Sequence, residues 1–232
     1  MIQIDEISQV AMVASSLHCD ELTKKLRQHG WYYGYFPISP VGLSLLTCLN
    51  EDRPNLFWRR YGTLGDICLN LQVKGLKKRN YETKRVSRAA TGPDFKRLFI
   101  GGRGKFGKIE KVTLRIHELP QQKMWGGFYW ADKKACRAFE NKICHINGSL
   151  AFLKLYTGLQ LPAVLRRKDK TFMMLYFEGM KAVVESHYYS VLKLAQSMGG
   201  DCLSRKEIHE LAPNLEKLLF SEVSEEGISY VP

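Results

Sequence analysis

The stretch Gly92 to Leu119, GPDFKRLFIGGRGKFGKIEKVTLRIHEL, decides the fold that we expect for the first half of the chain. It begins with a short amphipathic helix, passes through a turn with four glycines in the seven residues Gly101–Gly107, and ends in a strand. Apolar and polar side chains alternate in that strand, which is typical of a half-buried strand. The glycines can take up positive φ and let another molecule approach the backbone closely. The spacing alone leaves a nucleotide cradle and a tight structural turn both open, and favours the turn.

A second block, Arg60-Tyr61-Gly62-Thr63-Leu64-Gly65-Asp66, ends 35 residues before Gly101. Together the two blocks resemble the FAD-linked oxidases, the family of vanillyl-alcohol oxidase with a PCMH-type FAD-binding domain. The family pattern is roughly R-Y-G-x-x-R-D, followed by G-Y-D-L-x-x-L-x-x-G-S-E-G-T-L-G-x-I-T-x-x-T-L-R. Within the family, the FAD-binding subunit of glycolate oxidase is the most similar member, and the loose match extends from about Val10 to about Gly200.

The resemblance implies that this chain takes part in binding FAD. The residues it places near the flavin cleft are Tyr61, Gly62 and Asp66, and those with backbone contacts to the dinucleotide are Gly101, Gly104, Gly107 and Ile109. For Tyr61 and Asp66 an ordinary turn and a helix cap are almost equally good interpretations. No residue is assigned as catalytic, and the histidines show no ligand spacing, so we expect no metal site.

The sequence departs from the family pattern in two places. The segment around Gly42 lacks the family's double glycine, and nothing in the first 40 residues replaces the glycine-rich phosphate loop of relatives, since only Gly30 and Gly34 occur there. We therefore expect the chain to lack the first FAD-binding subdomain and to be truncated at both ends. A partner polypeptide or a homo-oligomer would then complete the flavin cleft. Arg103 replaces a family acid and makes the glycine turn more cationic.

Composition describes an ordinary globular chain of 232 residues, with 45% hydrophobic and 25% charged residues. No apolar run is long enough to span a membrane, and the first residues do not resemble a signal peptide, so we expect a cytoplasmic protein. The six cysteines are scattered without a C-x-x-C pair and are expected to be reduced.

Positive charge is concentrated between Arg53 and Arg115, where 17 Lys and Arg face four Asp and Glu, a net charge of +13. Such a field attracts an anion, whether a dinucleotide pyrophosphate, a nucleic acid or an acidic protein. The aromatic patch Trp31–Phe36 could stack on bases, but packing at the entrance of the domain is the better interpretation. Nucleic-acid binding is therefore the weakest functional alternative, since no recognised motif accompanies the charge.

The pattern of elements predicts two domains, 1–120 and 121–232. In the first, a strand at Val10–Ala14 and a helix from Asp20 to His29 precede a short helix near Leu45–Leu49. In the second, the order strand, helix, strand, strand, helix and a last short strand is that of a ferredoxin-like unit, which resembles the family's cap domain. The fold class expected is α+β, the second half of a PCMH-type domain followed by a ferredoxin-like cap unit.

We also expect a hairpin turn at residues 77–80 and a helical stretch near Ser204–Leu219. The long helix from Met180 to Met198 should carry an apolar stripe at Val184, Tyr188, Val191, Ala195 and Met198.

Three functions remain open on these grounds. The first, which we favour, is a subunit or fragment of an FAD-dependent oxidoreductase, in which flavin accepts a hydride from a 2-hydroxy acid such as glycolate or lactate. The second is a non-catalytic relic or interaction domain of the same fold that does not bind FAD alone. The third is nucleic-acid binding through residues 53–115.

Overall fold

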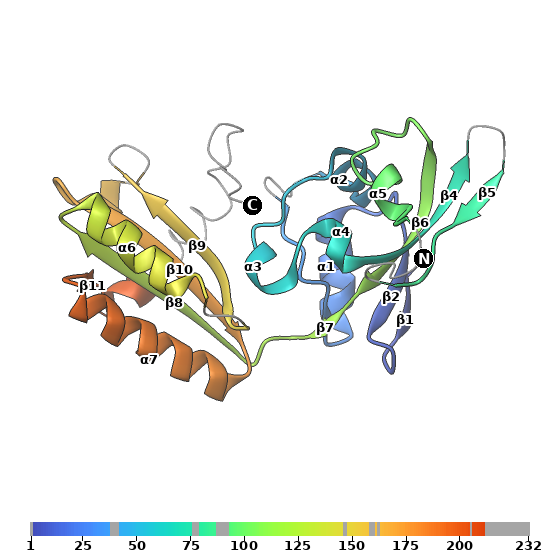
Figure 1. Cartoon of the computed structure of the whole chain (residues 1–232). Coiled ribbons are helices and arrows are strands. Elements are labelled where there is room, and N and C mark those ends of the chain that lie inside the picture. The colour runs from blue at the N-terminus through green and yellow to red at the C-terminus, as the bar shows by residue number, and fades with distance from the viewer. Residues whose placement is uncertain are drawn as a thin grey trace. The chain divides into compact units, whose positions relative to one another are not determined.

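The computed structural model describes residues 2–37, 42–75, 79–86, 93–145, 148–157, 161, 163–204 and 206–211. The chain divides into two compact units, Met1–Leu119 and Pro120–Pro232, which are described separately below (Figure 1). The part of the chain so described contains no helix that is both long enough and apolar enough to cross a membrane.

Unit 1 is built on an antiparallel five-stranded sheet of order β1-β2-β6-β4-β5. The strands are β1 (Ile2–Asp5), β2 (Val10–Ala14), β4 (Cys68–Gly75), β5 (Asn80–Glu82) and β6 (Gly107–Arg115). A separate pair joins β3 (Trp31–Tyr32) to β7 (His117–Glu118). The alternation in the opening stretch therefore predicts β6 correctly, and β6 lies at the centre of the sheet. The predicted turn at residues 77–80 falls mostly outside the described residues.

The helices of unit 1 are short. They are α1 (Cys19–Gln28), α2 (Leu45–Glu51), α3 (Trp58–Tyr61), α4 (Leu64–Ile67) and α5 (Lys96–Phe99). Side-chain caps mark the starts of α2 and α4. The Ser44 hydroxyl accepts from the Thr47 amide at the start of α2, and Asp52 ends that helix in the left-handed conformation. The helix predicted from Asp20 to His29 is present, whereas the one predicted around Leu98 is only the single turn α5.

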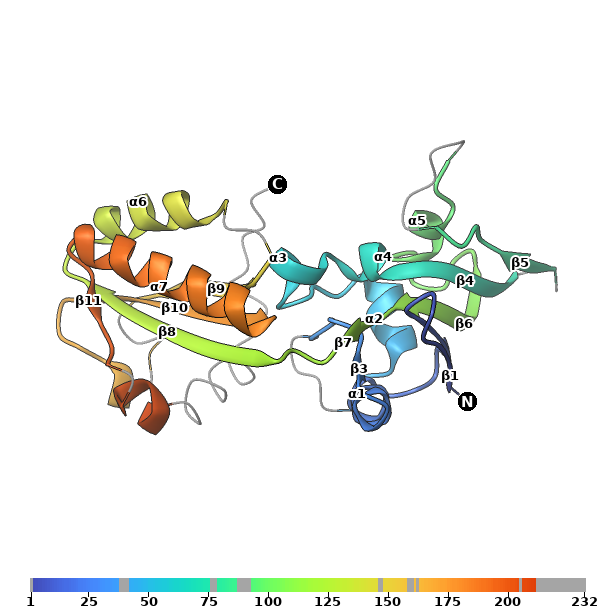
Figure 2. The same ribbon diagram turned by 90° about the horizontal axis from the view of Figure 1, so that it is seen from below.

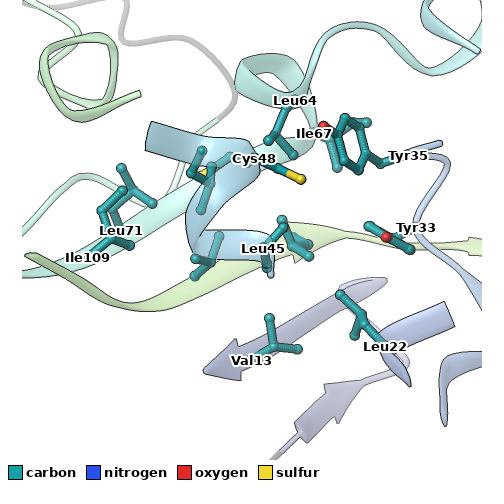
Figure 3. Packing of buried hydrophobic residues seen from close by; sticks show 14 of the residues in the cluster. Val13, Leu22, Tyr33, Tyr35, Leu45, Cys48, Leu64, Ile67, Leu71 and Ile109 are labelled. Atoms are coloured by element: carbon teal, nitrogen blue, oxygen red, sulfur yellow. The ribbon is translucent and has the colours of Figure 1, made fainter. Parts of the chain in front are cut away.

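The core of unit 1 lies between its sheet and its helices. Val13, Leu71 and Ile109 come from three neighbouring strands, and Leu22 and Leu45 come from α1 and α2 (Figure 3). The apolar spacing of α1, with Cys19, Leu22 and Leu26 all buried, brings one face of this helix onto the core. The aromatic patch Trp31–Phe36 also packs here, since Tyr33 and Tyr35 are fully buried.

Unit 2 has the topology that the sequence predicts. Its strands are β8 (Gln122–Trp130), β9 (Leu150–Tyr156), β10 (Thr171–Gly179) and β11 (Asp201–Cys202), in the order β11-β8-β10-β9 with every pair antiparallel. The helices α6 (Lys133–Ile143) and α7 (Lys181–Ser197) lie along one face of this sheet (Figure 2), and the 3-10 helix η2 (Ala163–Leu165) precedes β10. This is the ferredoxin-like order, and it confirms the α+β fold class.

Burial explains the long apolar run of β10, in which all nine residues from Thr171 to Gly179 are buried. Met173, Leu175 and Phe177 face the helices, where they meet the buried stripe of α7. The spacing predicted for that stripe is confirmed, because Val184 and Tyr188 are buried together with two residues further along α7. The helix predicted at Ser204–Leu219 begins as expected, but residues 212–219 lie outside the described ranges.

We expect Phe139→Ala to lower the free energy of unfolding by about 3–5 kcal/mol, because it removes a fully buried ring. The centroid of this ring lies 4.8 Å from that of Trp130 and 5.8 Å from that of Phe128. Denaturant unfolding followed by tryptophan fluorescence measures the change. Phe95→Ala removes a ring that is 60% exposed, and it should change stability by less than about 0.5 kcal/mol. Equal losses in the two variants would contradict the packing described.

Candidate functional site

The glycine turn after α5 is held against the end of α2. The Gly101 amide donates to the Leu49 carbonyl at 2.8 Å, and the Arg103 amide donates to the Asn50 carbonyl at 3.0 Å. These carbonyls belong to the last turn of α2, where helix carbonyls lack i+4 amide partners, and the Leu49 carbonyl also accepts from the Asp52 amide at 3.3 Å. The glycine turn therefore works as a C-terminal cap for α2, which supports the structural interpretation of its glycines.

Close packing explains why two of these positions need glycine. A Cβ atom at Gly102 would lie 2.5 Å from the Leu98 carbonyl oxygen, and one at Gly107, where φ is +147°, would lie 2.7 Å from the Lys74 carbonyl oxygen. Gly104 differs from both, because a Cβ atom there would meet nothing within 4 Å. The Gly104 and Phe106 amides have no acceptor among the described residues, so an external anion could reach them.

Gly62, Asp66 and Gly101 come together around Asp52. Asp66 forms a capping box with Thr63, whose hydroxyl lies 2.8 Å from the Asp66 carboxylate. A Cβ atom at Gly62 would lie 2.9 Å from that of Asp66, and one at Gly101 would lie 3.4 Å from that of Asp52. The predicted residues Gly62, Asp66 and Gly101 thus share one region, and Asp66 has the helix-capping role that was the alternative interpretation.

The electrostatics of this region are set by its two acids. Burial raises the pKa of Asp52, the Arg97 guanidinium opposes that shift, and the nearby Asp66 carboxylate adds to it. Carboxylates accept hydrogen bonds from hydroxyl groups and repel phosphates. The region between Asp52 and Asp66 therefore suits the hydroxyl-bearing part of a dinucleotide, and the free amides at Gly104 and Phe106 suit a phosphate.

The side chain of Tyr61 belongs to an aromatic cluster and not to the group around Asp52. Its ring meets those of Tyr32 and His117 at centroid distances of 5.6 and 5.0 Å, and the Arg60 guanidinium lies over it at 5.1 Å. A Cβ atom at Gly34 would lie 2.4 Å from the Tyr61 ring, so this ring lies directly on the backbone. Tyr61 is thus positioned by packing against the segment that follows β3.

Ile109 and Gly107 also lie away from Asp52. The Ile109 side chain is fully buried in the core of unit 1, and its carbonyl accepts from the Ser15 hydroxyl at 2.6 Å. Gly107 begins β6 and pairs with Gly75 at the end of β4. The structure therefore brings together only part of the predicted set, and it places these two residues in the framework of the sheet.

Asn55 is a buried residue of this region that the sequence reasoning missed. Its side chain is 2% exposed, and its amide nitrogen donates to the carbonyls of Gly34 and Gly62 at 3.0 and 2.8 Å. Its amide oxygen accepts from the backbone amides of Phe36 and Phe57 at 2.9 and 3.1 Å. One side chain thus joins the aromatic segment to the Gly62 turn. The only signal in the sequence is an asparagine after a proline, which also marks many ordinary turns.

Among the described Lys and Arg residues of unit 1, Lys96 is the one that is fully buried. Lys96 is 1% exposed, and its ammonium group donates to the carbonyls of Cys68 and Val86, each at 2.8 Å. Burial of the aromatic patch removes one argument for nucleic-acid binding, because Tyr32, Tyr33 and Tyr35 cannot stack on bases.

A cavity of about 580 Å³ lies beside α1. Its walls come from α1, including Cys19, Thr23 and Arg27, and from the segment Tyr33–Pro37. None of the seven residues that the sequence assigned to FAD lines it.

The histidines of unit 2 do not form a site. His187 accepts or donates at 2.6 Å to the Ser149 hydroxyl and so ties α7 to the start of β9, whereas His145 is exposed. The described ranges contain no cluster of three His, Cys, Asp or Glu side chains that could hold a metal ion.

The fold defines the class of protein. A solved structure of alkyldihydroxyacetonephosphate synthase superposes with a TM-score of 0.75 at 18% identity, covering 86% of this chain and 40% of that one. The described fold of this chain is therefore similar to that of the matching part of that structure. No protein-family model matches the chain.

Three proteins of known sequence are similar to this chain. Alkyldihydroxyacetonephosphate synthase of Caenorhabditis elegans is 21% identical over 224 residues, 93% of this chain and 37% of that protein. The uncharacterized FAD-linked oxidoreductase YgcU of Escherichia coli is 25% identical over 58% of this chain and 28% of its own length. Mitochondrial D-lactate dehydrogenase (cytochrome) of Arabidopsis thaliana is 32% identical over 44% of this chain and 18% of its own length.

This chain is related in sequence and in fold to the FAD-linked oxidases of the vanillyl-alcohol oxidase family, which confirms the resemblance read from its motifs. It spans well under half the length of these relatives. None of the three is a glycolate oxidase, so that finer assignment stays a prediction.

We expect Asn55→Asp to lower the free energy of unfolding by about 2 kcal/mol or more. The change removes both N–H donors and sets a carboxylate against the carbonyls of Gly34 and Gly62. Denaturant unfolding at neutral pH measures the effect. Asn80→Asp makes the same chemical change at an exposed position in β5 and should be nearly neutral. A neutral Asn55→Asp would show that these four bonds are not what holds the two segments.

His117 should make the stability of unit 1 depend on pH. Burial, with help from the charges of Arg115 and Arg60, lowers its pKa from 6.5 to about 4. Between these pH values the unfolded chain binds a proton that the folded chain does not, so stability should fall as the pH drops from 6.5 to about 4. His117→Gln should lose part of this dependence, whereas His29→Gln, at an exposed position, should keep it. Unfolding curves across this range, and the NMR titration of His117, decide the matter.

Proposed function

We propose that this chain is a flavin-binding part of an FAD-linked oxidoreductase, acting as a subunit or fragment. The observation that carries the proposal is the match of both units to FAD-linked relatives, which covers 93% of the chain in one of them. The free amides at Gly104 and Phe106 support it locally. We also propose that the protein is located in the cytoplasm.

The residues present fit one side of a dinucleotide site. Asp52 and Asp66 would bind hydroxyl groups of FAD, and the Gly104 and Phe106 amides, beside the exposed Arg103, would bind a phosphate. Because most other amides of the glycine turn already have acceptors, this chain offers few donors to a pyrophosphate. A partner polypeptide or a second copy of the chain would supply the remaining donors.

The substrate proposed is a 2-hydroxy acid such as lactate or glycolate, supported by the likeness to D-lactate dehydrogenase. Bound flavin would accept a hydride from the α-carbon of such a substrate. A second candidate follows from the alkyldihydroxyacetonephosphate synthases, whose match covers more of the chain. On that alternative the ligand is a phosphate ester of dihydroxyacetone carrying an alkyl group.

Purified full-length chain, incubated with FAD and passed through a gel-filtration column, should retain flavin absorbance. Gly104→Ala should weaken FAD binding by about tenfold, because the new methyl group points into open space where we place the cofactor. Gly30→Ala is its matched control: φ is +79° there and +73° at Gly104, and neither site has an atom within 4 Å of the added Cβ. The two variants thus carry the same backbone strain, and only Gly104 lies in the proposed site.

Two results would contradict this proposal. A colourless protein that cannot be reloaded with FAD would favour the non-catalytic interaction domain. Equal weakening by Gly104→Ala and Gly30→Ala would show that backbone strain, and not contact with FAD, causes the loss. For the substrate, anaerobic addition of D-lactate or glycolate should bleach the flavin absorbance, whereas no bleaching would turn attention to the phosphate ester.

A further inference from the structure

Two cysteines far apart in the sequence meet in the core of unit 1. The sulfur of Cys19, the first residue of α1, lies 3.7 Å from the sulfur of Cys48 in α2, and 29 positions separate the two residues. Both thiols are free, and their side chains are at most 1% exposed. Figure 3 shows Cys48 in the same core as Leu45 and Tyr35.

The surroundings favour one thiolate in this pair. The hydrogen bond from Cys19 lowers the pKa of Cys48 against the effect of burial, and the Tyr35 hydroxyl and the Arg53 charge lower it further. The same bond, together with burial, raises the pKa of Cys19. The buried Cys68 and Cys136 have no cysteine partner among the described residues, and burial is the main cause that raises the pKa of each thiol to about 12. The pair is therefore chemically distinct from the other buried cysteines.

The cavity beside α1 gives access to the pair. Cys19 contributes to its wall, next to Thr23 and Tyr33, and the Cys48 sulfur lies 3.7 Å from the Cys19 sulfur. A volume of about 580 Å³ is ample for a small solute such as hydrogen peroxide. A small solute in the cavity would thus lie beside Cys19, and from there it would need to pass one residue to reach the Cys48 sulfur.

We propose that Cys19 and Cys48 form a redox-active dithiol, which a small hydroperoxide entering through the α1 cavity converts into an intramolecular disulfide. This site is independent of flavin binding, and it uses none of the residues assigned to FAD.

The reaction balances as a two-electron oxidation. The Cys48 thiolate attacks one peroxide oxygen, the O–O bond breaks, and hydroxide leaves while a sulfenic acid forms on Cys48. The Cys19 sulfur then attacks the sulfenic sulfur, the proton of the Cys19 thiol passes to the hydroxide to form water, and the sulfenic oxygen departs as hydroxide. Two thiol sulfurs are oxidised and one peroxide is reduced.

The geometry leaves little distance to close. A disulfide bond is about 2.05 Å long, so the sulfurs need to approach by about 1.7 Å from their separation in the reduced protein. The bond would tie the start of α1 to α2 and would close a loop that includes the aromatic segment. Such a link restricts the unfolded chain and so should raise the melting temperature.

The test uses the full chain, fully reduced and then exposed to stoichiometric hydrogen peroxide. Free thiols are alkylated in denaturant, and the protein is digested without reductant and analysed by mass spectrometry. We expect a peptide pair linked through Cys19 and Cys48, lighter by two hydrogens than the separate peptides and released by dithiothreitol. The melting temperature should rise by a few degrees on oxidation and fall back on reduction.

Matched variants separate this reaction from general oxidation. Cys136→Ser, at another buried cysteine, should keep both the linked peptide and the shift in melting temperature, whereas Cys19→Ser and Cys48→Ser should lose both. Recovery of Cys19 and Cys48 as alkylated thiols, or as two separate sulfinic acids, would overturn the proposal. So would a shift in melting temperature that persists in Cys48→Ser.

Discussion

Four hydrogen bonds to a single buried amide hold the candidate site of unit 1 together. The Asn55 side chain donates to two backbone carbonyls and accepts from two backbone amides of the segments on either side of it. These backbone groups therefore have hydrogen-bond partners inside the protein. Gly62 is one of those partners, and it lies against Asp66. The position of Asp66, which caps α4, therefore depends on Asn55, a residue that has no obvious chemistry of its own.

The glycine turn shows how the same residues serve the framework and the site. Its Gly101 and Arg103 amides cap α2, and this fixes the turn next to Asp52. The groups left for a ligand are the backbone amides of Gly104 and Phe106, which have no acceptor among the described residues. A motif assigned to cofactor binding thus divides into positions required by packing and positions open to solvent, and only an account of each amide separates the two.

Local patterns predicted much of this fold. Alternation predicted β6, a continuous apolar segment predicted β10, and helical spacing predicted α1 and the buried stripe of α7. The order of elements was enough to predict the ferredoxin-like sheet of unit 2. Long-range contacts were beyond this reasoning: nothing in the local sequence brings Cys19 to Cys48 or gives Asn55 its partners. For the same reason the motif residues were expected to act together, although Tyr61 and Ile109 pack elsewhere.

The buried ammonium group of Lys96 has a consequence for chemical labelling. Its ammonium group bonds to one carbonyl at the start of β4 and to another in the segment after β5, and the side chain is buried between these two segments. An amine-directed reagent reaches it only when that part of unit 1 opens. In a protein whose other described lysines are largely at the surface, acylation of Lys96 therefore reports the opening rate of the sheet edge, against a background of fast surface reactions.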